Sequence, residues 1–451
     1  MKYKAILKEL YVGLGLTASL WMLYFVFLEN TRPVEYLRWQ TFRLLQWTAS
    51  PARKVQDPQR TPVVIIDIST LRPTPSETGF TPRADLELIL LQLVCTPAPD
   101  WNKNWNDKWK TWNGDVSNLL CSKDLGKKKR APPAVIGVDI DFSPQTEADG
   151  RWRFIDPASD PSFFQFSEQF DAPVFVGVSR TVDKPWNFWL GLPQYRQLAA
   201  ALWLQENPEK VLTTGSGAPS FASAIASTYR QRSSAQDSDK QRSVPHELRD
   251  IFFEQESETQ EAGVRNTVID YNASNAFKVV QHYNLASEVK RNPDEFSGKI
   301  VLIGDAHALD AGSGAFPESD TFRIPLHDGT VGGVEVHAAA VYTLIHPEAR
   351  FWTLRRPWDL TIDLLLAGAI TLFLAYYGYR RGGWPDEKHN RIFFVGGALS
   401  VLVLAILFSP FLIWDGCIIV VLSLTLHPYV HEKITRLEHK RKHHVGRESQ
   451  E

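Results

Sequence analysis

Long apolar runs lie near the two ends of the chain, and short apolar runs alternate with polar residues between them. A helix needs about 20 mostly apolar residues to cross the hydrocarbon core of a bilayer. Four stretches meet or approach that length: residues 10–28, 358–379, 392–408 and 411–430. The first holds 19 residues without a charge, whereas Asp415, His427 and Pro428 interrupt the last. The pattern predicts four transmembrane helices, of which the last has the weakest signal.

The segment before the first apolar run carries Lys2, Lys4 and Lys8, as a signal sequence does. Its apolar run is longer than the core of a usual signal peptide, and no clear small-x-small cleavage site follows. We therefore expect an uncleaved anchor, and the alternative is a cleaved signal peptide.

Basic residues set the expected orientation, because cytoplasmic loops of membrane proteins are enriched in Lys and Arg. Residues 1–9, 380–391 and 431–451 carry such residues. Placing all three segments in the cytoplasm puts residues 29–357 outside. Arg355 and Arg356 lie on the opposite side of the second span, but a large folded domain is translocated largely regardless of such charges. The sequence thus predicts a multi-pass membrane protein with a large extracytoplasmic segment.

Strand and helix patterns alternate between the first two apolar runs. Short β-branched runs predict strands, and apolar residues spaced three and four apart predict helices. The expected strands are residues 63–66, 134–138, 173–178, 268–269 and 300–303, and the expected helices are residues 84–94, 220–230 and 334–345. This order is typical of an α/β domain with a mainly parallel sheet and flanking helices. We expect residues 96–133 and 231–262 to be surface insertions.

Composition and motifs narrow the class of protein. Of 451 residues, 44% are hydrophobic and 22% are charged, which excludes a chain that is disordered throughout. Lys and Arg number 49 against 51 Asp and Glu, so the net charge is −2 and a protein that coats nucleic acid along its length is excluded. The sequence has no Walker or dinucleotide-binding loop and no GxSxG motif. We expect no cofactor and no nucleic-acid partner.

Several segments between residues 60 and 347 resemble a known family. PVVIIDISTL, beginning at Pro62, and AVIGVDIDFSP, beginning at Ala134, look like its first strand–helix–strand unit. PSFASAIAS and TVIDYNAS look like its middle blocks, and FSGKIVLIGDAHALDAGSGAF followed by GGVEVHAAAVYTLI looks like its closing block. The family is the second type of CHASE domain, a sensory extracellular module associated with cyclases and histidine kinases. The resemblance implies an extracytoplasmic sensor in a bacterial inner membrane, and it also implies a homodimer.

The chain departs from the best-known members of that family after the last apolar run. Those members continue into a cytoplasmic cyclase, kinase or similar output domain, whereas about 20 residues follow Val430 here. A catalytic domain needs roughly 100 residues or more. We therefore expect no catalytic output in this chain and a signal that leaves through a separate partner protein.

Acidic residues gather where the expected strands end. The candidate ligand-binding residues are Asp67, Asp139, Asp141, Asp305, His307 and Asp310. Ligands of open α/β sheets bind at the carboxyl ends of strands, where carboxylates can hold a cation or a polar ligand. The alternative is that these residues cap helices and fix loops through backbone N–H groups. Asp139 and Asp141 are two residues apart and are expected to face the same side of a strand. We expect His337 to be a packed helix residue rather than a ligand.

Four tryptophans recur at helical spacing within the first insertion: Trp101, Trp105, Trp109 and Trp112. Such a stripe can contact a partner, a glycan or the membrane surface, and the alternative is that it packs back onto its own domain. Cys95 and Cys121 flank the tryptophans, and a disulfide between them would close a loop of about 25 residues. Cys417 lies in an expected span, where we expect a reduced packing residue.

Two further hypotheses stand beside the sensor. The protein could be a structural or scaffold subunit of a membrane complex, with the tryptophan-rich insertion as its contact face. It could also be an extracytoplasmic metal-dependent enzyme built on the acidic cluster. The basic tail, residues 431–451, is expected to set topology and touch anionic lipid, or to dock a cytoplasmic protein. Asp363, in the second span, is the expected coupling residue between the outer domain and the helices.

Overall fold

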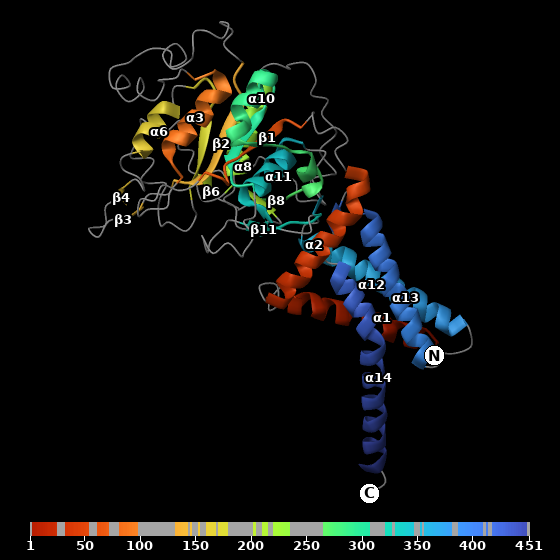
Figure 1. Ribbon diagram of the computed structural model, residues 1–451. Helices are drawn as coiled ribbons and strands as arrows, with labels where there is room; N and C mark the ends of the chain where they lie inside the picture. Colours follow the sequence, from red (N-terminus) through yellow and green to blue (C-terminus); the bar gives the residue numbers. More distant parts are fainter. Residues whose placement is uncertain are drawn as a thin grey trace. The chain divides into compact units, whose positions relative to one another are not determined.

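A parallel β-sheet forms the core of the segment between residues 53 and 350 in this computed structural model (Figure 1). Its strand order is β6 (Leu202–Trp203), β5 (Val174–Val178), β2 (Val135–Asp141), β10 (Ile300–Gly304), β1 (Val63–Asp67) and β9 (Lys278–Gln281). Every neighbouring pair in this order is parallel. β10, the last of the six along the chain, lies between β1 and β2. The predicted α/β fold with a mainly parallel sheet is confirmed.

Contacts divide the chain into two units. The α/β unit comprises residues 53–242 and 258–350, and the helical unit comprises residues 1–52, 243–257 and 351–451. Within these units the structure describes residues 2–24, 32–53, 61–71, 81–97, 131–142, 145–146, 152–153, 159–167, 170–178, 202–203, 210–214, 220–234, 265–306, 321–326, 330–346, 352–353, 356–380, 387–408, 412–413 and 417–448.

Helices cover both faces of the sheet, which explains why strands such as β1 are apolar along almost their whole length. On one face lie α3 (Arg83–Val94), α6 (Asp160–Ser167) and α10 (Leu285–Arg291), and on the other lie α8 (Phe221–Ser234) and α11 (Gly333–Ile345). Val64 and Ile66 belong to the core beneath the first group. Gly137 approaches Phe221 and Ile225 of α8 so closely that a Cβ atom would lie 2.8 Å and 2.6 Å from them. Glycine in β2 therefore lets α8 pack onto the sheet.

Two strands differ from the prediction. The strand expected at residues 268–269 is β8 (Arg265–Val268), which pairs antiparallel with β7 (Lys210–Thr214) outside the main sheet. The edge beside β1 is occupied by β9, a four-residue strand that the sequence pattern did not predict. Other short pairs are β3 (Gln145–Thr146) with β4 (Trp152–Arg153), β11 (Thr321–Arg323) with β12 (Thr330–Gly332), and β13 (Trp352–Thr353) with β14 (Leu412–Ile413).

A buried ion pair joins α3 to α6. Arg83 Nε donates to Asp160 Oδ1 over 2.6 Å, and the two side chains are 2% and 1% exposed. Arg83 also donates to the carbonyl of Thr81, and its guanidinium lies 4.0 Å from the centre of the Phe142 ring. Phe142 stacks in turn on Phe163 of α6. The pair therefore fixes the first turns of both helices over an aromatic cluster.

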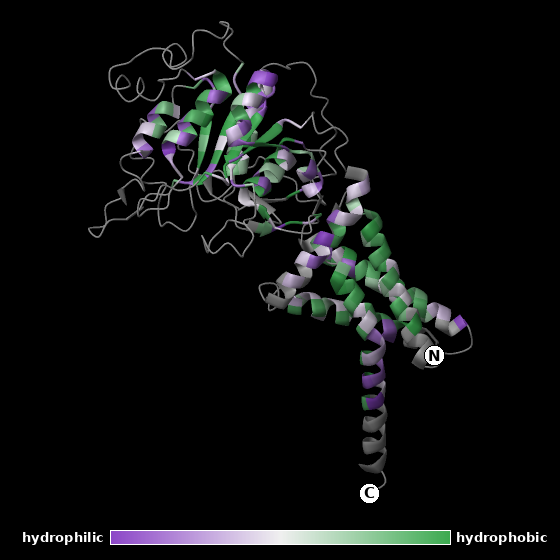
Figure 2. Ribbon diagram, in the orientation of Figure 1, coloured by the Kyte–Doolittle hydropathy of each residue, from purple (hydrophilic) through white to green (hydrophobic). Residues whose placement is uncertain are grey.

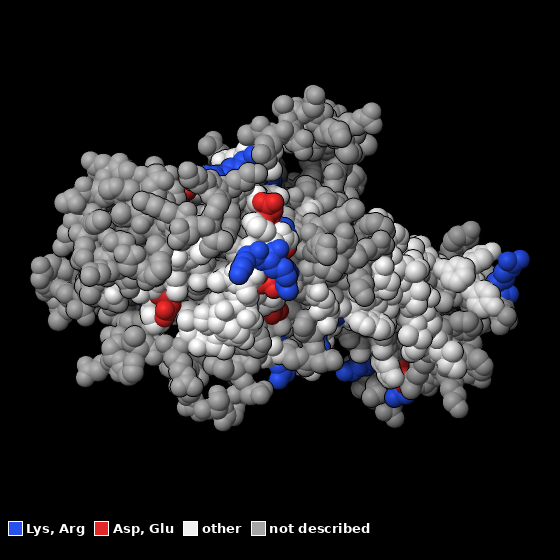
Figure 3. Space-filling model, turned by 45° about the horizontal axis from the view of Figure 1, so that its top comes forward, with Lys and Arg blue, Asp and Glu red and all other residues white. Residues whose placement is uncertain are grey.

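Charges on the surface of the α/β unit are intermixed. Lys278 pairs with Glu288 at 3.2 Å and with Glu295 at 3.4 Å, Lys299 pairs with Glu295 at 3.0 Å, and Arg291 pairs with Glu288. Figure 3 shows basic and acidic side chains lying next to one another on one face of the molecule. Such exposed pairs contribute little to stability, because water screens them.

Four long helices form most of the helical unit: α1 (Lys2–Leu23), α12 (Arg356–Arg380), α13 (Glu387–Phe408) and α14 (Cys417–Glu448). Three of these are long and apolar enough to cross a membrane, over Ile6–Leu23, Asp359–Tyr377 and Cys417–Leu437, and α13 has a shorter apolar stretch, Phe394–Phe408. The apolar stretches of the first and last of these helices begin at residues 6 and 417, whereas the spans predicted from the sequence begin at residues 10 and 411.

Small side chains let the long helices approach one another closely. A Cβ atom on Gly13 of α1 would lie 2.7 Å from Oγ1 of Thr371 in α12. The hydroxyl oxygens of Thr17 in α1 and Ser423 in α14 are 2.7 Å apart. Outward-facing apolar residues such as Leu365, at 68% exposure, are typical of helices that face lipid. The packing inside the helical unit is thus that of a membrane bundle.

α14 runs without a break from its apolar half into a hydrophilic half (Figure 2). The tail, up to residue 448, is therefore an extension of the last apolar helix. Pro428 lies inside α14, where its missing N–H removes one helical hydrogen bond.

A fifth helix of this unit, α2 (Arg32–Arg53), was not predicted. Its buried residues Phe42, Leu45 and Ala49 share one face, as in an amphipathic helix.

Candidate functional site

Three of the predicted acidic residues lie at one edge of the parallel sheet. Asp67 ends β1, Asp139 lies near the end of β2, and Asp305 directly follows β10. Because these three strands are parallel neighbours, their carboxyl ends meet. Asp139 and Asp305 are close enough for their charges to interact. This edge is the candidate site of the α/β unit.

Asp67 is fully buried and accepts hydrogen bonds from three segments. Its Oδ1 accepts from the backbone N–H groups of Ser69 at 2.9 Å and Ala306 at 3.2 Å. Its Oδ2 accepts from the amide of Gln281 at 2.7 Å and the hydroxyl of Ser69 at 3.1 Å. Burial by itself raises the pKa of Asp67, but these hydrogen bonds outweigh burial and hold the pKa below its ordinary value. This carboxylate ties together the chain after β1, the end of β9 and the loop after β10.

Asp139 faces a histidine of α11. The Asp139 Oδ1 and His337 Nε2 atoms are 3.5 Å apart, and the two side chains are 4% and 3% exposed. The imidazole ring also packs edge-on against Phe221, with the ring centres 5.1 Å apart. Burial, and to a lesser extent the charge of Asp305, raises the pKa of Asp139 to about 7. A buried acid–histidine pair with a carboxyl pKa near neutrality can exchange protons at physiological pH.

The raised pKa of Asp139 predicts how stability depends on pH. Its ordinary pKa is 3.8, so between about pH 4 and 7 the folded chain binds a proton that the unfolded chain releases. This group therefore makes the protein less stable as pH rises through that window, by a few kcal/mol in all. The His337 imidazole and the Asp305 carboxylate both face this carboxyl.

Thermal unfolding of the full chain from pH 5 to 8, compared with an Asp139→Asn variant, measures this effect. The stability of Asp139→Asn relative to the unsubstituted protein should increase as pH rises, because asparagine cannot ionise. A constant difference across this range would show that Asp139 is ionised throughout.

Asp141 does not share the environment of Asp139. A β-bulge interrupts the pairing of β2 with β5 between Val138 and Asp141. The bulge breaks the strict alternation on which the expected same-face pair depended. Asp141 is exposed, whereas the Asp139 side chain is buried. The two carboxylates therefore do not act as a matched pair.

Several candidate residues lie outside the described residues: His307, Asp310, Trp101, Trp105, Trp109, Trp112 and Cys121. Cys95 is disulfide-bonded, and Cys417 is buried and is not part of a disulfide. Cys121 is the remaining cysteine of the three in the chain. Among the residues that the structure describes, no group of three or more His, Cys, Asp or Glu side chains is arranged to hold a metal ion.

A second ionisable cluster, which sequence reasoning missed, lies in the helical unit. Glu9 Oε1 of α1 is 2.6 Å from His431 Nδ1 of α14, and Glu9 Oε2 is 3.6 Å from His427 Nε2. Glu9 and His427 are 2% and 1% exposed, and the His427 ring stacks on Phe394 of α13. The spacing of four between the histidines was a signal that they share one helix face. Asp363 of α12 is also fully buried in this unit.

Comparison with protein families gives a match to the CHASE2 domain over residues 121–376, which is more than half of the chain. Its limits differ from the resemblance described above, because the match begins after α3 and extends into α12. The structure nevertheless places β1 between β9 and β10 in the same sheet. Comparisons with curated proteins and with solved structures give no significant match.

Proposed function

This chain belongs to the CHASE2 domain family, a family of sensory extracellular domains, and we propose that it is a membrane-anchored extracytoplasmic sensor that signals through a separate partner protein. In this proposal the α/β unit lies outside a bacterial inner membrane, and the four long helices cross that membrane. A stimulus at the α/β unit favours one packing of the helices, and the partner responds to the change at the cytoplasmic face.

The packing of α1 against α14 is the observation that supports the proposal most. Glu9 contacts His431, and Thr17 contacts Ser423. Residue numbers therefore rise along α1 as they fall along α14, so the two helices are antiparallel. The start of α1 lies beside the hydrophilic half of α14, and in a membrane both lie on the same side. This arrangement favours an even number of crossings and so supports a crossing by α13 in addition to α1, α12 and α14.

Contacts of α13 are consistent with a fourth crossing. Phe394 stacks on His427 with ring centres 4.3 Å apart, and a Cβ atom on Gly397 would meet Leu424 at 3.8 Å. α13 and α14 thus form an antiparallel hairpin. The apolar stretch of α13 is short for a bilayer of about 30 Å, but a bilayer thins around a short span at modest cost. Lys and Arg residues in the loop after α12 and in the tail favour the cytoplasmic side for both segments.

Reporter fusions test this topology. We expect green fluorescent protein to fluoresce when fused after Gly383 and after Glu451, because both points are cytoplasmic in a four-span protein. Alkaline phosphatase fused after Pro410 should be active, since that point is outside. If α13 does not cross, fluorescence will be found after Gly383 but not after Glu451.

α14 provides the route to a partner, because one helix connects the membrane bundle to the basic tail. We expect affinity purification of the full-length protein from crosslinked membranes to recover a cytoplasmic signalling protein. A chain that ends at Leu437 is the control, because it retains Glu9, His431 and the whole apolar stretch. Loss of the partner with this shorter chain supports the proposal, and equal recovery from both chains contradicts it.

A further inference from the structure

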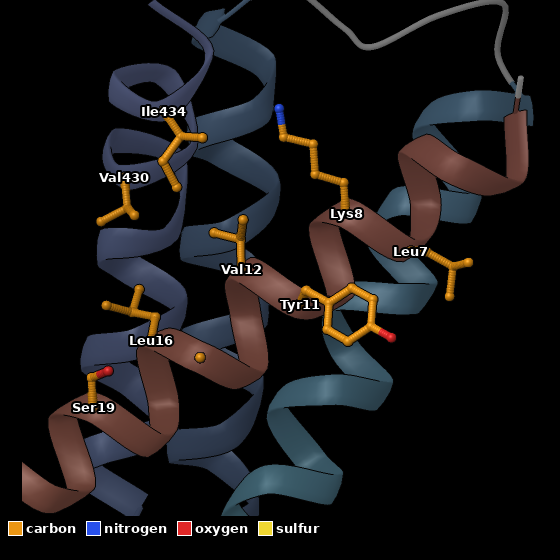
Figure 4. Close-up of a pocket in the computed structure, with 9 residues that line it drawn as sticks. Leu7, Lys8, Tyr11, Val12, Leu16, Ser19, Val430 and Ile434 are labelled. Carbon is orange, nitrogen blue, oxygen red and sulfur yellow. The ribbon is translucent and has the colours of Figure 1, made fainter. Parts of the chain in front are cut away.

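An open groove of about 690 Å³ runs between α1 and α14 (Figure 4). Along α1 it is lined by residues that recur once per helical turn, from Lys8 through Val12 and Gly15 to Ser19. Val430 and Ile434 of α14 form the opposite wall. In Figure 4 the Lys8 side chain extends toward the end of the groove where Ile434 lies. The groove is therefore lined mainly by apolar residues, with a lysine at one end.

The position of the groove restricts what can occupy it. All its lining residues lie within Ile6–Leu23 or Cys417–Leu437, the apolar stretches of α1 and α14. In a membrane the open side faces hydrocarbon, so the occupant has to be apolar. The twelve residues from Lys8 to Ser19 are separated by eleven helical steps, which span about 16 Å at 1.5 Å per residue. This is close to the roughly 15 Å of a single leaflet, half of the hydrocarbon core.

The charged residues at one end of the groove indicate which polar group an apolar occupant would carry there. Glu9 is turned away from the groove into its contact with His431, and Glu432 pairs with Arg436. Lys8 lines this end of the groove, whereas the exposed Lys433 of α14 lies outside the lining. Clusters of Lys and Arg at the cytoplasmic side of spans attract anionic phospholipids. A phosphate group at this end is thus favoured over a neutral partner.

We propose that the groove binds an anionic phospholipid of the cytoplasmic leaflet, with one acyl chain between α1 and α14 and the phosphate beside Lys8. The proposal rests on the four-span topology proposed above. The volume of the groove lies within the range of small-molecule sites in proteins. A lipid held there contacts the first and the last helix at once, so its binding stabilises their present packing.

Native mass spectrometry of the full-length protein, titrated with phosphatidylglycerol or phosphatidylcholine of the same chain length, tests the proposal. Lys8→Gln should weaken phosphatidylglycerol binding about fivefold and leave phosphatidylcholine unchanged, since one Lys near a membrane surface contributes about that factor. Gly15→Leu should remove retained lipid of both kinds, because a side chain at Gly15 meets nothing within 4 Å and fills the groove.

Matched controls separate these effects from general ones. Lys433→Gln removes the same charge from an exposed side chain outside the groove, and Gly396→Leu adds the same side chain at another open position on α13. Equal effects of Lys8→Gln and Lys433→Gln would overturn the proposal, as would unchanged lipid retention in Gly15→Leu. If the native mass spectra show a dimer of the unsubstituted protein that Gly15→Leu lacks, the groove binds a helix of a second copy of the chain instead of a lipid. The reporter fusions give the topology independently, so failure of either proposal is recognised separately.

Discussion

Replacing Asp160 with alanine should lower the free energy of unfolding of the α/β unit by about 3–5 kcal/mol. The substitution leaves the guanidinium of Arg83, at 2% exposure, without its carboxylate partner in the protein interior. Hydrogen exchange of the full-length protein measures the effect. Backbone amides of α3 and α6 should both exchange faster in the variant, because the unit that contains them opens more often.

A second substitution distinguishes the loss of the ion pair from a general loss of packing. Arg83→Met combined with Asp160→Ala should recover much of the stability, because a buried pair replaced by apolar groups is often neutral. Glu288→Ala breaks exposed pairs with Lys278 and Arg291 and should cost less than about 1 kcal/mol. If Asp160→Ala costs no more than Glu288→Ala, the buried pair does not stabilise the joint between α3 and α6.

Replacing Asp67 with alanine should destabilise the sheet by about 3 kcal/mol or more. The change leaves the N–H of Ala306 and the amide of Gln281 without their acceptor in a buried region, and each such loss costs about 1–3 kcal/mol. Asp67→Asn keeps one acceptor oxygen and should show a smaller loss. In Asp67→Ala we expect faster amide hydrogen exchange in β1, in β9 and at the start of the loop after β10.

Near-normal stability of Asp67→Ala would contradict the structural role of this carboxylate. It would return Asp67 to the group of residues available for a ligand. Asp139→Asn is the comparison at the same edge, because Asp139 has a histidine partner and a pKa of about 7, whereas the pKa of Asp67 is lowered.

Much of the fold was readable from the sequence, because strand and helix patterns depend on neighbouring residues. The run Val63–Ile66 and the closing block at Ile300–Gly304 predicted β1 and β10 directly. Membership of a sheet depends instead on distant pairing, so β8 was placed in the wrong sheet and β9 was missed. β9 has four residues at an edge, and so short a run carries almost no periodic signal.

The roles of individual side chains depended on contacts that no local pattern contains. Acidic residues at strand ends predicted that Asp67, Asp139 and Asp305 would meet. The bulge in β2 and the arrival of His337 from α11, about 200 residues later, make the environment of Asp139 differ from that of Asp67. Glu9 and His431 are further apart still, and only helix packing brings them together.

Pro428 divides α14 into an N-terminal segment that packs in the helix bundle and a C-terminal segment that extends to Glu448. The arm from Pro428 to Glu448 is roughly 30 Å long at 1.5 Å per residue. A bend of about 10° at the proline, where one hydrogen bond is missing, would move the far end of that arm by roughly 5 Å. A displacement below 1 Å near Glu9 would thus be magnified several-fold at the end of the tail. A small movement at the Glu9–His431 contact would then be converted into a larger movement at the C-terminal end of α14.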